Sequence, residues 1–230
     1  MNVSDIFKDA FKFPASNWKR FLILGIIVLV STLLSVFGSH FGVSYIFLIM
    51  LPVYVLTFLY RGYLLRVIKV SINEGNELPA FNKWIQIFID GLKVFLVNII
   101  YLIIPVIVLM VGIFLTFDLS SGKFQFANLS PVVIIVLLIG VLLYALFMFF
   151  YEIGLANMAY HGKLEAALNL SEIREILGKI GWKKYLMVFV ILLLITVVLY
   201  IIGYFSGSIP LIGVIVIGIL ISPYIELIVA

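Results

Sequence analysis

The sequence contains no cysteine, so it can form neither a disulfide nor a site that needs a thiolate, such as an iron–sulfur cluster or a cysteine-ligated zinc site. Charged residues are also scarce, at 11% of the 230 residues, against roughly 25% in a soluble domain. With so few charged side chains, a soluble fold would leave large apolar patches facing water. These absences exclude a soluble enzyme, a disordered tail and a freely diffusing nucleic-acid binder.

The residues that are present are mostly apolar, with 65% hydrophobic residues. Six apolar stretches have about the 20 residues that a helix needs to cross the hydrocarbon layer, at 21–38, 42–60, 94–117, 131–151, 185–205 and 209–229. Backbone N–H and C=O groups in lipid need partners within the protein, and the polar alternation of barrel strands is absent, so we expect helices. The sequence therefore predicts an all-α integral membrane protein with six transmembrane helices in a single polytopic domain, residues 1–230.

Positive charge falls almost entirely on one side of the predicted spans. Of the 15 Lys and Arg residues, only Lys123 lies in a connection on the other side. Because basic residues concentrate on the cytoplasmic side, this pattern predicts a multi-pass protein of the cell membrane with both termini in the cytoplasm. The first span follows twenty residues of mixed charge and no Ala-x-Ala-like cleavage site, so we expect it to stay in the mature protein.

Each cytoplasmic segment carries a short amphipathic pattern directly before an outgoing span. Apolar residues recur at helical spacing in residues 3–11, 81–92 and 173–180, and Ser171 is a candidate N-cap of the third segment. Helices this short are expected to lie in the membrane interface rather than to cross the membrane. The predicted fold is three helical hairpins, each preceded by a cytoplasmic interfacial helix.

This order of elements suggests a threefold parallel repeat over residues 1–60, 78–160 and 164–230. The sequence Trp-Lys-Arg-Phe-Leu at 18–22 resembles Trp-Lys-Lys-Tyr-Leu at 182–186, at the same point of the first and third units. Trp beside basic residues is also a common interfacial anchor. The pattern is therefore compatible with a true triplication and with independent anchors.

Several short motifs resemble a known family. They are Gly62-Tyr63 with Arg66, Leu78-Pro79-Ala80-Phe81 with Trp84, Asp90-Gly91-Leu92-Lys93, and Gly162-Lys163-Leu164-Glu165-Ala166-Ala167. In these motifs the chain resembles an archaeal and bacterial family of multispanning membrane proteins catalogued as a domain of unknown function, number four thousand and thirteen. The resemblance implies a membrane topology. It implies no activity, cofactor or catalytic residue, because the family has none to carry over.

Glu152 is the candidate functional residue inside the spans. A carboxylate in the membrane costs about 2.5–3.5 kcal/mol on insertion scales, so such residues are functional candidates by default. We expect Glu152 to face the protein interior, with Asn157, Asn98 or a tyrosine hydroxyl as its partner, forming an intramembrane polar site. The alternative is a structural role in which Glu152 extends to the interface or pairs with a cytoplasmic lysine. Glu226 is expected to be interfacial.

The sequence offers no catalytic or metal-binding motif. Gly-x-Ser-x-Gly, His-Glu-x-x-His and the phosphate-binding Gly-x-x-x-x-Gly-Lys-Ser/Thr pattern are all absent. His40 and His161 are predicted to lie on opposite sides of the membrane, so they cannot share a metal. We expect no catalytic residue, no cofactor and no metal.

Three classes of function remain open. The first is a non-enzymatic accessory subunit or lipid-organising component that contacts membrane lipids, and a membrane-protein partner through its amphipathic helices, with no nucleic acid. The alternative is a permease-like or solute-capturing subunit with a cavity near Glu152. An intramembrane enzyme acting on lipid would need two carboxylates or a metal in one cavity.

Overall fold

The computed structural model describes residues 3–38, 43–118, 122–125, 129–206 and 217–229, and these are almost entirely helical. In chain order the elements are α1 (Val3–Lys12), the 3₁₀ turn η1 (Phe13–Ser16), α2 (Trp18–Gly38), α3 (Val43–Ile72), α4 (Trp84–Phe114), β1 (Phe117–Asp118), β2 (Lys123–Phe124), α5 (Pro131–His161), the 3₁₀ turn η2 (Leu164–Leu168), α6 (Leu170–Ile180), α7 (Trp182–Ser206), the π-helical turn η3 (Ile217–Ile221) and α9 (Ser222–Val229).

Four of the described helices, α2 to α5, are long and apolar enough to cross a membrane, and the bent pair of α6 and α7 is a fifth candidate if the two are counted as one span. They correspond to the first five predicted spans, although α3, α4 and α5 extend well beyond the predicted bounds because their apolar runs continue into amphipathic turns. The predicted sixth span, 209–229, falls partly outside the described residues. Its described part, Gly218–Ile228, is an apolar helix shorter than a full span.

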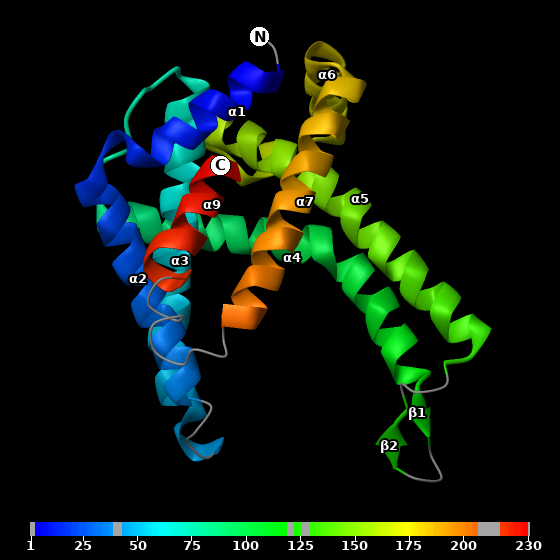
Figure 1. Ribbon diagram of the computed structural model, residues 1–230. Coiled ribbons are helices and arrows are strands. Elements are labelled where there is room, and N and C mark those ends of the chain that lie inside the picture. Colours follow the sequence, from blue (N-terminus) through cyan, green and yellow to red (C-terminus); the bar gives the residue numbers. More distant parts are fainter. Residues whose placement is uncertain (1–2, 39–42, 119–121, 126–128, 207–216, 230) are drawn as a thin grey trace.

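The short amphipathic helices α1 and α6 and the two strands lie at opposite ends of the molecule. Figure 1 shows α1 and α6 at the end where both termini lie, and the antiparallel pair β1–β2 at the other end. α6 is bent by 95° from α7, and its apolar residues Ile173 and Leu177 are fully buried against α5. This agrees with the predicted amphipathic helix before the fifth span.

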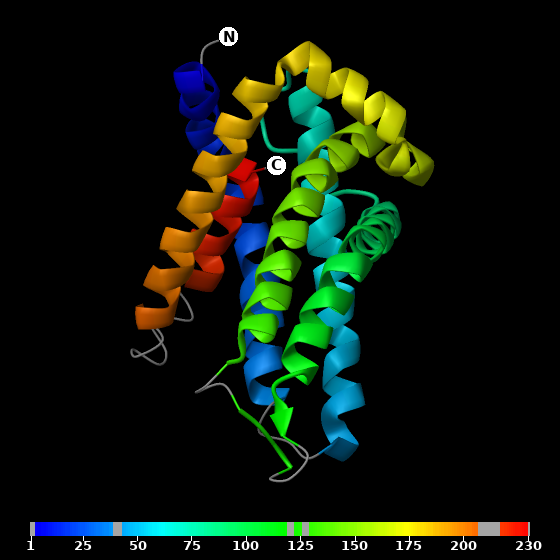
Figure 2. The same cartoon turned by 90° about the vertical axis from the view of Figure 1, so that its right-hand side faces the viewer.

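The second predicted interfacial helix, 81–92, is not a separate element. Its residues from Trp84 onward are the first turns of α4, which continues without a break to Phe114. In Figure 1 this first part of α4 crosses α3, and in Figure 2 it is seen nearly end-on before the helix turns to run beside α5. Pro105 lies inside α4, and a proline removes one helical hydrogen bond and favours such a bend.

The crossing of α3 and α4 depends on two glycines. A Cβ at Gly62 would lie 2.7 Å from the backbone N of Gly91 and closer still to the carbonyl oxygen of Ile87. A Cβ at Gly91 would lie 2.6 Å from the carbonyl carbon of Phe58. The two backbones are therefore in direct contact, an approach that larger residues would prevent.

The connection between α3 and α4 is fastened to both α3 and α2. Tyr63 stacks on Phe81, with ring centroids 3.9 Å apart, and donates a hydrogen bond to the carbonyl of Pro79 at 2.9 Å. Arg20 of α2 donates to the carbonyl of Leu78, whose side chain is fully buried. Residues of the motifs that resemble the family thus build this helix crossing.

Local sequence explains the ends of α5 and α6. Ser130 caps α5 by accepting a hydrogen bond from the N–H of Val133 at 3.3 Å, and Gly162 ends it with a φ of 72°. At α6 the N-cap is Asn169, which accepts from the N–H of Glu172 at 3.3 Å. The candidate cap Ser171 lies inside the first turn of α6 instead.

Candidate functional site

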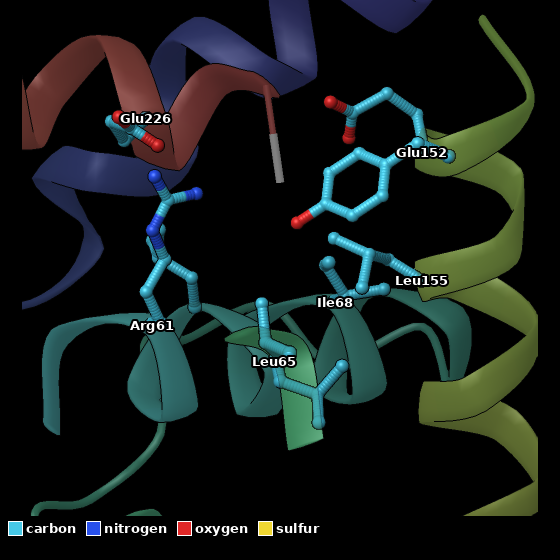
Figure 3. Close-up of a pocket in the computed structure, with 9 residues that line it drawn as sticks. Arg61, Leu65, Ile68, Glu152, Leu155 and Glu226 are labelled. Atoms are coloured by element: carbon cyan, nitrogen blue, oxygen red, sulfur yellow. The ribbon is translucent and has the colours of Figure 1, made fainter. Parts of the chain in front are cut away.

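A small cavity with a charged lining lies between α3, α5 and α9 (Figure 3). Its volume is about 50 Å³, which is enough for water molecules or an ion but far below the roughly 300–1,000 Å³ of sites for organic ligands. Its polar lining consists of Arg61, Glu152, Glu226 and Tyr151. We call it the polar cavity.

Helical periodicity brings these side chains together. Arg61, Leu64, Leu65 and Ile68 are spaced i, i+3, i+4 and i+7 on α3, so one face of this helix lines the cavity. The neighbouring residue Gly62 faces α4 at the close crossing, which leaves Arg61 on the cavity side. Glu152 comes from α5 and Glu226 from α9.

The three charged side chains share the space without forming a close ion pair. Figure 3 shows the guanidinium of Arg61 directed towards Glu226, while the carboxylate of Glu152 enters from the opposite side. Among the described residues no ion pair within 4 Å joins them. All three are only partly buried, so the cavity retains room between its charges.

The hydroxyl of Tyr151 is a buried polar group without a hydrogen-bond partner among the described residues. Its side chain is 2% exposed and lines the polar cavity. Asn98 of α4 faces this tyrosine, although no hydrogen bond to the hydroxyl forms at normal geometry. A buried, unpaired hydroxyl costs about 1–3 kcal/mol, so the cavity presents a polar position that an occupant would satisfy.

Glu226 also lines a second cavity, of about 150 Å³, between α2, α3 and α9. The lining of this second cavity includes five hydroxyl side chains, from Ser31, Thr32, Thr57, Tyr60 and Ser222. Ser31 and Thr32 lie near the middle of α2. Polar groups therefore continue from Glu152 through Glu226 into the central part of the apolar helices.

Asn157, one of the residues predicted to pair with Glu152, has another partner. Asn157, which is 3% exposed, donates to the carbonyl of Ala166 at 2.9 Å, and Tyr101 donates to the adjacent carbonyl of Ala167 at 2.7 Å. These two bonds hold η2 against α4 and α5. Of the predicted set, Asn157 is therefore bonded to η2, whereas Asn98 lies beside Tyr151 of the polar cavity.

Two members of the site lay outside the set predicted from sequence. Glu226 was expected at the interface but lies opposite Glu152, and Arg61 was counted only as a cytoplasmic charge. The signal for Arg61 was its position within a continuous apolar helical pattern, four residues before Leu65 and seven before Ile68. No local signal indicated that α9 would return beside α3.

At the C-terminal end of α5, His161 pairs with Glu172 of α6, with Nε2 and Oε1 2.7 Å apart. The amide of Asn157 and the imidazole of His161 lie beside the Glu172 carboxylate and hold its pKa below the ordinary value. Among the described residues no group of three His, Asp or Glu side chains is arranged to hold a metal.

The comparisons with known proteins give a family but no activity. No curated protein and no solved structure matches the chain. Residues 45–207 match the model of the family described as "Protein of unknown function (DUF4013)". The matched region contains the helix crossing of α3 and α4 together with Arg61 and Glu152, and it ends before Glu226. Because the match covers well over half of the sequence, the chain belongs to the DUF4013 family.

Proposed function

We propose that this protein is a non-enzymatic membrane protein that captures one proton or one small monovalent cation in the polar cavity, as a permease-like or solute-capturing subunit. The observation that carries the proposal is the meeting of Arg61, Glu152 and Glu226, from three different helices, in one small cavity. Ionisable side chains inside membrane spans are expensive and commonly mark ion or proton pathways.

The charge balance of the cavity specifies the kind of occupant. When all three groups are ionised, one guanidinium faces two carboxylates, and the cavity carries a net charge of −1. Uncompensated charge is costly in a low-dielectric interior. One proton shared by the carboxylates, or one monovalent cation, would neutralise the site. The unpaired hydroxyl of Tyr151 would supply a further oxygen to a cation or to an accompanying water.

The volume of the cavity supports capture rather than chemistry on an organic substrate. Two carboxylates in one cavity can act as the acid and the base of a catalytic site. However, about 50 Å³ leaves no space for a lipid or metabolite beside them. The second cavity, which is lined by hydroxyl groups and shares Glu226 with the polar cavity, would allow a captured ion to move further along the helices.

The proposed topology has six spans in three hairpins, with the residues 209–229 as the sixth span and both termini in the cytoplasm. The support is the charge asymmetry of the connections and the position of α1 and α6 at the end opposite Lys123 (Figure 1). In this topology the polar cavity lies in the cytoplasmic half of the membrane.

Infrared difference spectroscopy of the protein in phosphatidylcholine nanodiscs tests this proposal. If a proton is the occupant, a protonated carboxylic acid band is expected in wild type and is lost in Glu152→Gln and in Glu226→Gln. If a cation is the occupant, the band is expected only after sodium and potassium are replaced by choline. Glu165→Gln, on an exposed residue of η2 outside the cavity, is the matched control. Identical spectra for wild type and Glu152→Gln under all conditions would refute the proposal.

A second candidate function is an accessory or lipid-organising component, and one observation favours it. In an 18-residue apolar window of each of the four long candidate spans, only 17–22% of the residues are buried inside the protein, so most of the apolar surface there is available to lipids or to helices of a partner. Stoichiometric co-purification of a second membrane protein from native membranes, retained in Glu152→Gln, would support this candidate over ion capture.

A further inference from the structure

A larger concave site lies where the C-terminal end of α3, the start of α4 and the end of α5 meet. Its volume is about 540 Å³, within the range of sites for small molecules. Four basic side chains line it, from Arg66, Lys69, Lys83 and Lys93, and Asp90 is the acidic side chain among the lining residues. We call this site the basic pocket. It shares only Leu65 with the polar cavity.

The positive charges of the basic pocket are only partly compensated. Lys93 lies 3.6 Å from Asp90, whose carboxylate also accepts a hydrogen bond from Gln86 at 2.9 Å. Lys69 and Lys83 form no ion pair with any described residue. The pocket therefore carries a net charge of +3, with two ammonium groups free to bind an anion.

Other features of the pocket hold this charge in place. Arg66 donates to the backbone carbonyl of Asn82 at 2.7 Å, so the guanidinium is fixed at the wall. Lys83 occupies the N-cap position of α4 in a left-handed conformation, with a φ of 51°. The positive end of the dipole of this 31-residue helix therefore adds to the positive field there. The buried residues Met158 and Ala159 of α5 contribute to the apolar part of the lining.

We propose that the basic pocket binds a phosphate group, carried either by the headgroup of an anionic lipid or by a soluble phosphate compound. Ammonium and guanidinium groups are the usual protein partners of phosphate. Basic pockets between spans on the cytoplasmic side bind phosphate-bearing lipid headgroups, and the basic pocket lies at the end of the molecule that the charge asymmetry assigns to the cytoplasm. A concave site with free lysines distinguishes this location from a basic surface that attracts anions without binding them.

The test uses the full-length protein in nanodiscs and measures thermal unfolding and retained lipid by native mass spectrometry. One arm compares pure phosphatidylcholine with mixtures containing phosphatidylglycerol. The other arm adds inorganic phosphate or pyrophosphate to phosphatidylcholine nanodiscs, with sodium chloride at matched ionic strength as the reference. The variant is Lys69→Gln/Lys83→Gln. The control is Lys19→Gln, which removes an exposed lysine at the same end of the molecule.

We expect the double variant to weaken binding about thirtyfold, equivalent to about 2 kcal/mol at 1.4 kcal/mol per factor of ten, while Lys19→Gln keeps wild-type affinity. Stabilisation by phosphatidylglycerol that the double variant loses identifies a lipid headgroup as the source. Stabilisation by phosphate or pyrophosphate that the double variant loses identifies a soluble compound. The inference is overturned if the double variant responds to every anion as wild type does, or if Lys19→Gln reduces binding equally.

Discussion

Replacing Gly62 with alanine tests the helix crossing that supports the site. The new Cβ would lie 2.7 Å from the backbone N of Gly91, whereas ordinary van der Waals contact begins at about 3.4 Å. The helices would therefore have to separate by at least about 0.7 Å, and by more to relieve the closer approach to the carbonyl oxygen of Ile87. Neither neighbour is a flexible side chain that can move aside, so the whole crossing must shift.

Two opposing effects decide how much Gly62→Ala changes the free energy of unfolding. Alanine favours a helix over glycine by about 0.5–1 kcal/mol, whereas overpacking of a tight contact costs about 1–3 kcal/mol or more. We expect the clash to dominate at Gly62, because it involves backbone atoms and because separating α3 from α4 exposes Ile87 and Val97, both fully buried. A net loss of about 2 kcal/mol corresponds to a fall in Tm of roughly 4–8 °C for a chain of this size.

Thermal unfolding in detergent measures the effect, and Gly178→Ala is the matched control. Gly178 lies in α6, and a Cβ there would meet nothing within 4 Å, so this variant should be as stable as wild type or slightly more stable. Gly91→Ala should destabilise the fold as Gly62→Ala does, and the double variant should cost less than the sum of the two single variants because both crowd the same contact between α3 and α4. Equal stability of Gly62→Ala and Gly178→Ala would refute the close crossing.

The remaining predictions concern η2, α6 and the topology. Tyr101→Phe should cost about 1–3 kcal/mol of unfolding free energy, because it leaves the carbonyl of Ala167 without its partner; an unchanged Tm would contradict the attachment of η2. The pKa of Glu172 is lowered in the folded state, so its carboxylate stabilises the fold at neutral pH, and this contribution is lost as the pH falls from its ordinary value of 4.5 to the lower folded-state pKa. A plot of Tm against pH should therefore fall less steeply over this range for Glu172→Gln than for wild type, and parallel curves would count against the interaction. A cysteine placed at Lys123 should react with a membrane-impermeant reagent added outside cells, and one at Arg174 should not; the opposite result would reverse the proposed orientation.

The sequence alone determined that the chain is helical, with several apolar helices long enough to cross a membrane, because composition and the length of apolar runs are local properties. The starts of α2 and α7 at Trp18 and Trp182 coincide with the repeated anchor motifs, and the amphipathic pattern of 173–180 became the buried face of α6. The motifs that resemble the family also identified the family correctly.

The tertiary structure decided which polar groups meet. Glu152 was recognisable from the sequence as a charged residue within an apolar stretch. Its neighbours Arg61 and Glu226 are separated from it by 91 and 74 positions in the sequence. The periodicity of one helix does not indicate which of its faces another helix will cover. The merging of 81–92 into α4 likewise followed from packing, because contact at Gly62 and Gly91 holds the first turns of α4 across α3. Polar sites between helices depend on such long-range contacts, whereas the preference of each helix for lipid is already present in its own residues.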